Sequence, residues 1–388
     1  MRLVNVAPVS AAELTANFNG WSAIIDARSP AEFAEDHIPG ALNWPVLNDE
    51  ERRIVGTMYK QNSPFEARKL GAALVARRIA GHIDQELSAM PREWRPIIYC
   101  WRGGQRSGSL ALVLAQIGFR TAQLVGGYRA FRAVVRAELD VLPQEHRYTV
   151  LCGRTGSGKT RLLHALAAQG AQVLDLEALA NHRGSILGAM PGQPQPTQKR
   201  FDTLVWEALR GFDKTLPVFV ESESARVGVL RVPPALLVHM HQHGRCIRIE
   251  TADDARQQLL IEDYAELTAD APAFNQLLQG LVELRGHATV EHWQALASGG
   301  RWPEVITELM TRHYDPLYEH SMQRSFATLA TAEVVNLGDA RDAALAVAAK
   351  RLLSESPNAP APPDQASRHG SGSAGPSADG PPGGVSPR

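Results

Sequence analysis

Short apolar runs alternate with segments of helical period along the first 140 residues. Short, mainly apolar segments predict buried strands at 96–100, at 122–125 and within 22–30, where the strand ends in a turn. The segments whose apolar positions recur with a helical period are 66–89, 108–118 and 128–140. This alternation predicts an α/β domain over residues 10–140 with a mainly parallel sheet, which ends before the breaker Leu142-Pro143.

A second α/β pattern follows this breaker, over residues 146–250. Its predicted strands are 148–151, 173–176, 217–221 and 246–249, and its predicted helices are 161–168 and 199–210. Residues 251–352 are almost entirely helical in period, so we expect a helical region there. Residues 353–388 are rich in Pro, Gly, Ser and Ala with almost nothing to bury, so we expect a disordered tail.

Composition narrows the class of protein. With 388 residues, 44% of them hydrophobic and 21% charged, the chain has the length for two globular domains and a tail. The net charge of −1 gives no overall attraction to nucleic acid, so such a partner must meet a local basic patch. Three cysteines without zinc-site spacing argue against a disulfide scaffold and for a reducing compartment. No apolar run is long enough to span a bilayer, and we expect a cytoplasmic protein without a membrane partner.

One cysteine lies in a loop with the features of a reactive site. Cys100 comes between a predicted buried strand and a helix N-terminus, in a loop that holds two glycines and two arginines, Arg102 and Arg106. Backbone N–H groups at a helix N-terminus favour the thiolate form of a nearby cysteine, and the two guanidinium groups would add to that effect. We expect a reactive thiolate in an anion-binding cradle, with Cys100, Arg102 and Arg106 as the catalytic candidates.

This loop alone leaves several interpretations of Cys100 open. A free cysteine is often a small buried hydrophobe and nothing more. The spacing Cys100-x5-Arg106 is that of cysteine-dependent phosphatases, in which the arginine holds the phosphate and the thiolate attacks phosphorus. A thiolate in such a cradle also suits chalcogen transfer, in which the cysteine carries a persulfide or selenopersulfide.

A phosphate-binding loop opens the second domain. Residues 153–160 fit the pattern G-x4-G-K-[ST], follow a predicted strand and begin a helix, as the mechanism of such a loop requires. The glycines let backbone N–H groups close around phosphate oxygens, and Lys159 supplies a positive charge. The predicted phosphate-binding residues are Gly153, Gly156, Gly158, Lys159 and Thr160.

The sequence offers several candidates for the acidic residue that would hold Mg²⁺ beside this P-loop. An Asp at the end of a neighbouring strand commonly holds Mg²⁺ in such domains, but the predicted strand 217–221 ends in Glu221. Asp175 and Glu177 are alternatives near the second strand. The sequence therefore predicts phosphate binding but not nucleotide hydrolysis. No metal site is firm, and Thr160 and Glu221 are the candidate ligands for Mg²⁺.

Residues 10–140 resemble a rhodanese domain. The matching segments are 26–33, 37–41 and 124–128, with the Cys100 loop between them in the right order. The pattern departs from the family at Asp36, where Gly is usual, and we expect this to matter little for the chemistry. The resemblance implies that Asp26 and Arg28 are structural, and it favours chalcogen transfer at Cys100.

A rhodanese-like domain joined directly to a P-loop domain resembles the tRNA 2-selenouridine synthases. Further segments similar to that family are 55–61, 100–109, 175–185 and 313–318, so the resemblance spans about residues 10–350. It implies exchange of sulfur for selenium in 2-thiouridine at the tRNA wobble position, with selenophosphate as donor, and S-geranylation from geranyl diphosphate. It also implies a selenophosphate-supplying enzyme as partner and no tightly bound cofactor.

We expect a division of labour between the two domains. The loop of Lys159 binds the diphosphate, and Cys100 carries or receives selenium. For tRNA, Trp101 is the candidate for stacking on an anticodon base, and His182 and Arg183 are candidates for contacting phosphates or the modified base. Two alternatives remain at this point: a cysteine-dependent phosphatase with a regulatory nucleotide site, and a non-catalytic chalcogen carrier.

Overall fold

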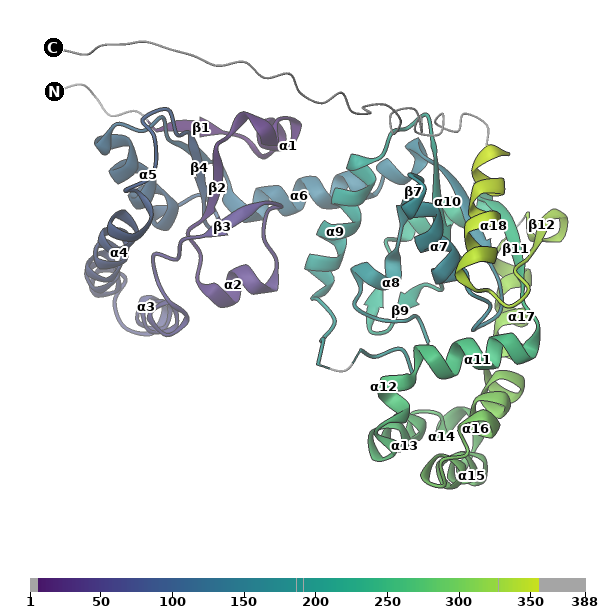
Figure 1. The fold of residues 1–388 in the computed structure, drawn as a ribbon. Helices are drawn as coiled ribbons and strands as arrows, with labels where there is room; N and C mark the ends of the chain where they lie inside the picture. The colour runs from purple at the N-terminus through teal and green to yellow at the C-terminus, as the bar shows by residue number, and fades with distance from the viewer. Residues whose placement is uncertain (1–5, 186, 191, 327, 356–388) are drawn as a thin grey trace, which may run out of the picture.

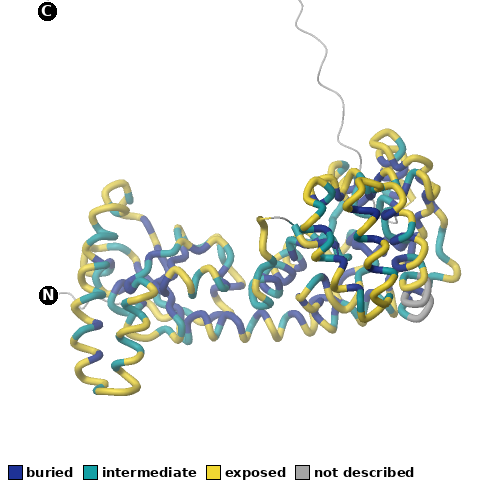
Figure 2. Tube along the Cα trace, turned by 90° about the horizontal axis from the view of Figure 1, so that it is seen from below, coloured by how far each residue is buried: buried dark blue, intermediate teal, exposed yellow. Residues whose placement is uncertain are grey.

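A computed structural model of the chain describes residues 6–185, 187–190, 192–326 and 328–355. Two α/β bodies lie next to each other and are bridged by helix α6 (Gly127–Leu139) (Figure 1). Buried positions gather inside each body (Figure 2). The α/β fold class is confirmed, with one parallel five-stranded sheet in each body. From residue 356 on, the predicted disordered tail lies outside the described residues.

The first domain is built on a sheet with the strand order β1-β5-β4-β2-β3, in which every pair is parallel. Its strands are β1 (Ala7–Val9), β2 (Ala23–Asp26), β3 (Ala41–Asn43), β4 (Pro96–Tyr99) and β5 (Ala122–Leu124). Its helices besides α6 are α1 (Ala11–Ala16), α2 (Pro30–Glu35), α3 (Asp49–Gln61), α4 (Pro64–Glu86) and α5 (Gln105–Ile117). All four residues of β4 are buried, because a central parallel strand is covered on both faces.

Local sequence sets several helix starts in this domain. At α1, the Ser10 hydroxyl accepts the Glu13 N–H at 3.2 Å, and the Glu13 carboxylate accepts the Ser10 N–H at 2.7 Å. This reciprocal pair is a capping box. Helix α5 begins at Gln105, three residues earlier than the predicted start at 108, because Gly104 is its N-cap. The earlier start brings the N-terminus of α5 up to Cys100.

The second domain has the sheet order β12-β11-β6-β8-β7, again with every pair parallel. Its strands are β6 (Arg147–Cys152), β7 (Gln172–Leu174), β8 (Pro217–Glu221), β11 (Arg245–Glu250) and β12 (Glu333–Asn336). Its helices are α7 (Lys159–Ala168), α8 (Leu176–Leu179), α9 (Gln198–Gly211), α10 (Pro234–His243) and α18 (Asp342–Ser354). A small hairpin joins β9 (Arg226–Val227) to β10 (Leu230–Arg231).

A helical lobe extends from this domain and has its own core around the fully buried Trp293. Its helices are α11 (Asp253–Asp263), α12 (Ala265–Thr268), α13 (Ala271–Gln279), α14 (Val282–Arg285), α15 (His287–Ser298), α16 (Trp302–Leu309) and α17 (Asp315–Ser325). The expectation of a helical region over 251–352 needs correction at β12. This edge strand pairs with β11, so the chain returns to the P-loop sheet after the lobe. Within the described part of the chain, no helix has both the length and the apolar character to cross a bilayer.

The two domains meet where α6 packs on α9, and a buried carboxylate lies in this contact. The Asp36 Oδ2 accepts hydrogen bonds from the Tyr128 hydroxyl at 2.8 Å and from the Thr203 hydroxyl at 2.9 Å. Arg132 of α6 donates to Thr203 at 3.0 Å and to Asp202 at 2.9 Å. Asp36, where the sequence departs from the rhodanese pattern, thus connects the first domain to the second.

Candidate active site

Cys100 follows β4 directly, at the carboxyl end of the first sheet. Its Sγ accepts hydrogen bonds from the Gly104 N–H at 3.3 Å and from the Ser107 hydroxyl at 3.1 Å. Both donors lie at the start of α5, where unpaired backbone N–H groups favour negative charge. Cys100 is 3% exposed, so its sulfur is held against these donors and largely shielded from solvent. The arrangement suits a thiolate.

Two glycines give the Cys100 loop its shape. Gly103 has a φ of +65°, and a Cβ at this position would collide with the carbonyl oxygen of Leu124. Gly127 has a φ of +56°, and a Cβ there would collide with the carbonyl oxygen of Cys100. The Tyr128 N–H donates to that same Cys100 carbonyl at 2.8 Å. A side chain at either glycine would separate the loop from the start of α6.

The two predicted arginines of the cradle differ in their surroundings. Arg106 forms an ion pair with Glu32 of α2, with 2.5 Å between Nη1 and Oε2. Arg102 is exposed and forms no ion pair with another described residue. The positive charge of Arg106 is therefore partly neutralised, which the sequence did not reveal because Glu32 lies 74 residues away. A phosphatase that used Arg106 to hold phosphate would first have to break this pair.

Trp101 lies where the two domains meet. Its ring is 5.4 Å from that of Tyr128 between centroids, and the Lys199 ammonium of α9 lies 5.8 Å from its centroid. It is half-buried and packs on the main core cluster. In this arrangement its ring already has neighbours, and its stacking on a tRNA base remains a prediction.

The predicted P-loop joins β6 to α7, as the sequence required. The predicted residues Gly153, Gly156, Gly158, Lys159 and Thr160 lie together in this loop and the first turn of α7. Gly156 and Gly158 have φ values of +78° and +84°, which residues with a side chain rarely adopt. The Lys159 ammonium spans the loop, donating to the carbonyl of Gly153 at 2.8 Å and to that of Arg154 at 3.4 Å. The loop therefore has the form that encloses a phosphate.

A buried ion network supports this loop. The fully buried Arg256 of α11 donates to the Thr155 carbonyl at 2.9 and 3.1 Å and to the Asp315 carboxylate at 2.6 Å. Arg154 also pairs with Asp315, at 3.2 Å. Asp315 begins α17 directly after a π-helical segment, Met310–Tyr314. The sequence placed Asp315 inside a matching segment, but it missed Arg256, which no local motif marks.

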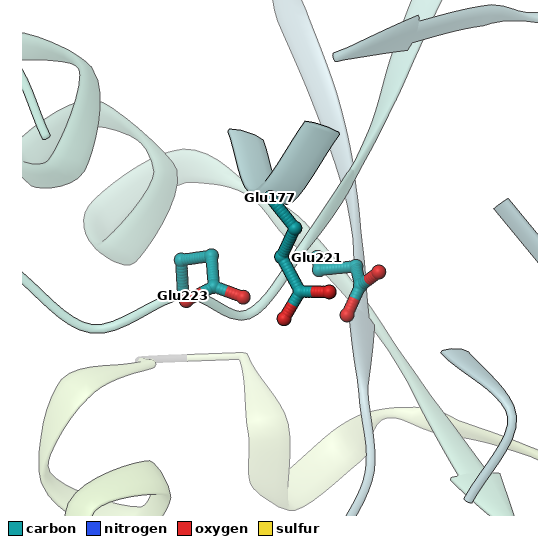
Figure 3. A group of neighbouring side chains, drawn as sticks. All are labelled: Glu177, Glu221 and Glu223. Carbon is teal, nitrogen blue, oxygen red and sulfur yellow. The ribbon is translucent and has the colours of Figure 1, made fainter. Parts of the chain in front are cut away.

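Three glutamates from α8, β8 and the turn after β8 gather at one point (Figure 3). The charge of Lys159 acts on all three of them. One carboxylate oxygen of each of Glu177, Glu221 and Glu223 lies within 4.8 Å of the others. Burial, together with the charges of Glu221 and Glu223, raises the pKa of Glu177 to about 10. Burial and the charge of Glu221 raise the pKa of Glu223 to about 7. Burial also raises the pKa of Glu221, and the charge of Lys159 offsets part of this.

The residues of this cluster fit a divalent cation. Carboxylate and hydroxyl oxygens are the ligands that Mg²⁺ prefers. The Glu221 Oε1 is buried without a hydrogen-bond partner among the described residues, and a hydrogen bond with Thr160 lowers the pKa of Glu221. Thr160 and Glu221, the predicted candidates, thus lie together with Glu177. Glu223 was missed, although it lies two residues beyond the end of a predicted strand.

The loop after α8 covers these glutamates. A Cβ at Gly184 would collide with the carboxylate of Glu177, so the loop lies directly against the cluster. His182 is 8% exposed, and burial lowers its pKa. Arg183 donates to the carbonyl of Asp263 in the helical lobe. The structure therefore places His182 and Arg183 by the P-loop and not beside Cys100, and their contact with tRNA remains a prediction.

Two family models match the chain, one for each domain. A rhodanese-like domain matches residues 10–134, and the tRNA 2-selenouridine synthase AAA domain matches residues 146–287. These matches agree with the Cys100 loop in the first domain and the P-loop in the second.

Curated relatives match almost their entire length. The tRNA 2-selenouridine synthase of Nitrosomonas europaea is 36% identical over 360 residues, which cover 80% of this chain and 92% of the relative. The tRNA 2-selenouridine synthase of Hydrogenovibrio crunogenus is 35% identical over 328 residues, which cover 78% of this chain and 89% of the relative. The prediction that the chain is an enzyme is confirmed by these matches, and the chain belongs to the tRNA 2-selenouridine synthase family.

Proposed function

We propose that this enzyme replaces the sulfur of wobble 2-thiouridine in tRNA with selenium from selenophosphate, by way of an S-geranylated intermediate. The names of its relatives support tRNA as substrate and selenium as the element transferred. The observation that carries the two-step route is the pair of anion sites in separate domains, the Cys100 loop and the P-loop. Transfer of selenium alone would need one such site.

The first step alkylates the thiocarbonyl sulfur of the uridine. The sulfur attacks the first carbon of the geranyl chain, the bond from that carbon to the diphosphate oxygen breaks, and N3 of the base loses its proton. Pyrophosphate leaves with an additional negative charge. Lys159 and the N–H groups at the start of α7 would stabilise that charge, because they belong to the P-loop and to the helix N-terminus that it opens.

The second step exchanges sulfur for selenium. The selenium of selenophosphate attacks C2 of the base, and the geranyl group leaves as a thiol. The phosphorus–selenium bond breaks as the Cys100 thiolate takes the phosphoryl group, which water then releases from the sulfur as phosphate. No oxidant or reductant is needed, because selenium enters and sulfur leaves at the same oxidation level. We assign this step to the loop of Cys100, with the exposed Arg102 as a cation near the incoming anion.

A diphosphate bound next to three glutamates would bring several negative charges together, and a cation would offset them. Mg²⁺, when bound, would offset the charge of the diphosphate, and the residues that would hold it are Thr160, Glu177, Glu221 and Glu223. Hydrolysis of a nucleotide plays no part in either step. A selenophosphate-supplying enzyme is the partner that this chemistry requires.

The test is mass analysis of 2-thiouridine tRNA after incubation with geranyl diphosphate and selenophosphate, each alone and both together. We expect geranylated tRNA with the first, and selenated tRNA when both are present. Lys159→Ala should lose geranylation, and Cys100→Ser should geranylate tRNA without exchanging selenium. The matched controls are Lys60→Ala, on an exposed face of α3, and Cys246→Ser in β11. If Cys100→Ser blocks geranylation and still exchanges selenium, this assignment of the two sites is wrong.

A further inference from the structure

Two arginines face each other across the small hairpin of the second domain. In this antiparallel pair, Arg226 of β9 lies directly opposite Arg231 of β10, and both side chains are exposed. Neither forms an ion pair with another residue that the structure describes. Like charges directly opposite each other destabilise a strand pair, so this arrangement costs stability unless an anion lies between them.

We propose that this hairpin binds the phosphate backbone of the tRNA substrate on the path between the P-loop and the Cys100 loop. The inference rests on the proposed function in that tRNA is the substrate and its base visits both sites. It adds the surface that holds the RNA while the base moves from one site to the other.

Two glutamines fix the backbone of the hairpin to the second domain. The Gln195 side chain donates to the Val227 carbonyl at 3.0 Å and accepts the Val229 N–H at 2.9 Å. The Gln198 side chain donates to the Arg231 carbonyl at 2.9 Å and accepts the Arg231 N–H at 2.8 Å. The hairpin is therefore held in a defined position while its arginine side chains stay exposed, which lowers the cost of ordering them on a ligand.

One end of the hairpin adjoins the P-loop site. A Cβ at Gly228, in the turn, would collide with the ring of His182, which belongs to the loop that covers the three glutamates. The hairpin also begins three residues after Glu223, a member of that cluster. Figure 1 shows β9 next to α8, which carries another of the glutamates. RNA bound on the hairpin therefore lies next to the P-loop site.

The start of α9 leads from the hairpin to the Cys100 loop. Gln198, which is bonded to Arg231, is followed by Lys199. The Lys199 ammonium lies 5.8 Å from the centre of the Trp101 ring, and Trp101 directly follows Cys100. The hairpin and the first turn of α9 thus form a continuous surface between the two sites.

The free positive charge on this surface is concentrated on the hairpin. Lys199 is paired with Glu35 at 2.6 Å, whereas Arg226 and Arg231 have no such partner among the described residues. Because the net charge of the chain is −1, RNA must be attracted by local charges such as these. Directly opposed residues of a strand pair have Cβ atoms roughly 5 Å apart, so neighbouring phosphates of one RNA strand can each meet one guanidinium.

The test is the binding of 2-thiouridine tRNA to the full chain, measured by fluorescence anisotropy over a series of salt concentrations. We expect Arg226→Gln/Arg231→Gln to bind tRNA about tenfold more weakly. The slope of log K against log salt should become shallower by roughly 1.5, since two phosphate contacts are lost. Arg226→Lys/Arg231→Lys keeps both charges and should keep the slope. The matched control is Arg245→Gln/Arg351→Gln, which removes two arginines that pair with Glu333 at the edge of the sheet.

Two further measurements separate RNA binding from a role in folding. Arg231→Glu places an opposite charge across from Arg226, so it should raise the melting temperature by about 1 °C while it weakens tRNA binding. In Arg226→Gln/Arg231→Gln, the KM for tRNA in geranylation should rise about tenfold, with kcat within about twofold of the wild type. Pyrophosphate affinity should be unchanged in all these variants, because the hairpin lies outside the P-loop.

The inference is overturned if Arg226→Gln/Arg231→Gln binds tRNA with unchanged affinity and salt slope, or if the double Lys variant loses as much of the slope. It is also overturned if the Gln variant loses affinity for polyglutamate and none for tRNA, which would identify a site for an acidic protein segment. Failure of the proposed function looks different. In that case the hairpin variants would weaken tRNA binding as expected, but the wild type would leave the tRNA mass unchanged with geranyl diphosphate and selenophosphate.

Discussion

Thr203 of α9 donates a hydrogen bond to Asp36 of the first domain at 2.9 Å, and Asp36 is completely buried. Tyr128 donates to the same carboxylate through its hydroxyl, and its backbone N–H donates to the carbonyl of Cys100. The Asp36 carboxylate therefore connects Thr203 of the second domain with Tyr128, and Tyr128 contacts the Cys100 loop. Directional hydrogen bonds of this kind fix the relative position of two elements more narrowly than apolar contact alone.

Removing this carboxylate should destabilise the protein. Asp36→Ala would leave the hydroxyls of Tyr128 and Thr203 without their partner in a buried contact. We expect the free energy of unfolding to fall by about 2–4 kcal/mol. Urea denaturation followed by tryptophan fluorescence measures it, since the domain contact holds Trp101 and Trp206. Asp84→Ala, at an exposed position of α4, is the matched control, and an Asp36→Ala midpoint equal to that of the control would contradict the prediction.

The glutamate cluster should make stability depend on pH. The folded-state pKa of Glu177 is about 10, above its ordinary value of 4.5, so folding favours the protonated carboxyl. Its contribution to stability is complete below about pH 4.5 and is lost as the pH rises toward 10. Glu177→Gln imitates the protonated form. Without divalent cations, this variant should melt about 3 °C above the wild type at pH 8.5 and close to it at pH 5.

Thermal melts at the two pH values measure this difference. Glu266→Gln, at an exposed position of α12, should change neither melting temperature. An equal shift at both pH values, or a lower melting temperature of Glu177→Gln at pH 8.5, would show that the carboxylates do not repel one another in the folded protein.

Arg256 should hold the P-loop in place. Arg256→Lys keeps the positive charge but loses the planar guanidinium, whose N–H groups reach the Thr155 carbonyl and Asp315 at the same time. We expect the free energy of unfolding to fall by about 2–4 kcal/mol and pyrophosphate affinity to fall about tenfold. Chemical denaturation and calorimetry measure the two effects. Arg68→Lys on α4 is the control, and unchanged pyrophosphate affinity in Arg256→Lys would refute the supporting role.

By pairing with Arg106, Glu32 should reduce the positive charge that acts near the Cys100 thiol. Glu32→Gln frees Arg106 from its ion pair, which adds a positive charge at the start of α5. We expect Cys100 to react about three- to tenfold faster with an anionic disulfide reagent, because the freed cation attracts it. Neutral iodoacetamide should show a smaller change, and Glu66→Gln on α4 should show none. Equal acceleration with both reagents would indicate a change in accessibility instead.

Short stretches of sequence predicted the two anion-binding loops and strands β2, β4, β5, β6, β7, β8 and β11, but not the short strands β1, β3, β9 and β10. Parallel strands that are covered on both faces, such as β4 and β8, consist of continuous apolar residues, and the pattern therefore predicts them. The P-loop is also local, because its glycines, Lys159 and Thr160 all act within eight consecutive residues. Strand β12 was missed because it lies at the edge of the sheet, where only Val335 is buried.

What the sequence determined by itself is the kind of chemistry: a cysteine at a helix start, a P-loop and the order of two α/β domains. The tertiary structure decided which charges meet. Arg106 lies 74 residues from Glu32, Arg256 lies 101 residues from Thr155, and Asp36 lies 167 residues from Thr203. A buried charge must find a partner wherever the fold brings one, because leaving it unpaired away from water is costly. Such pairs carry no local pattern, so they emerge only when the chain is folded.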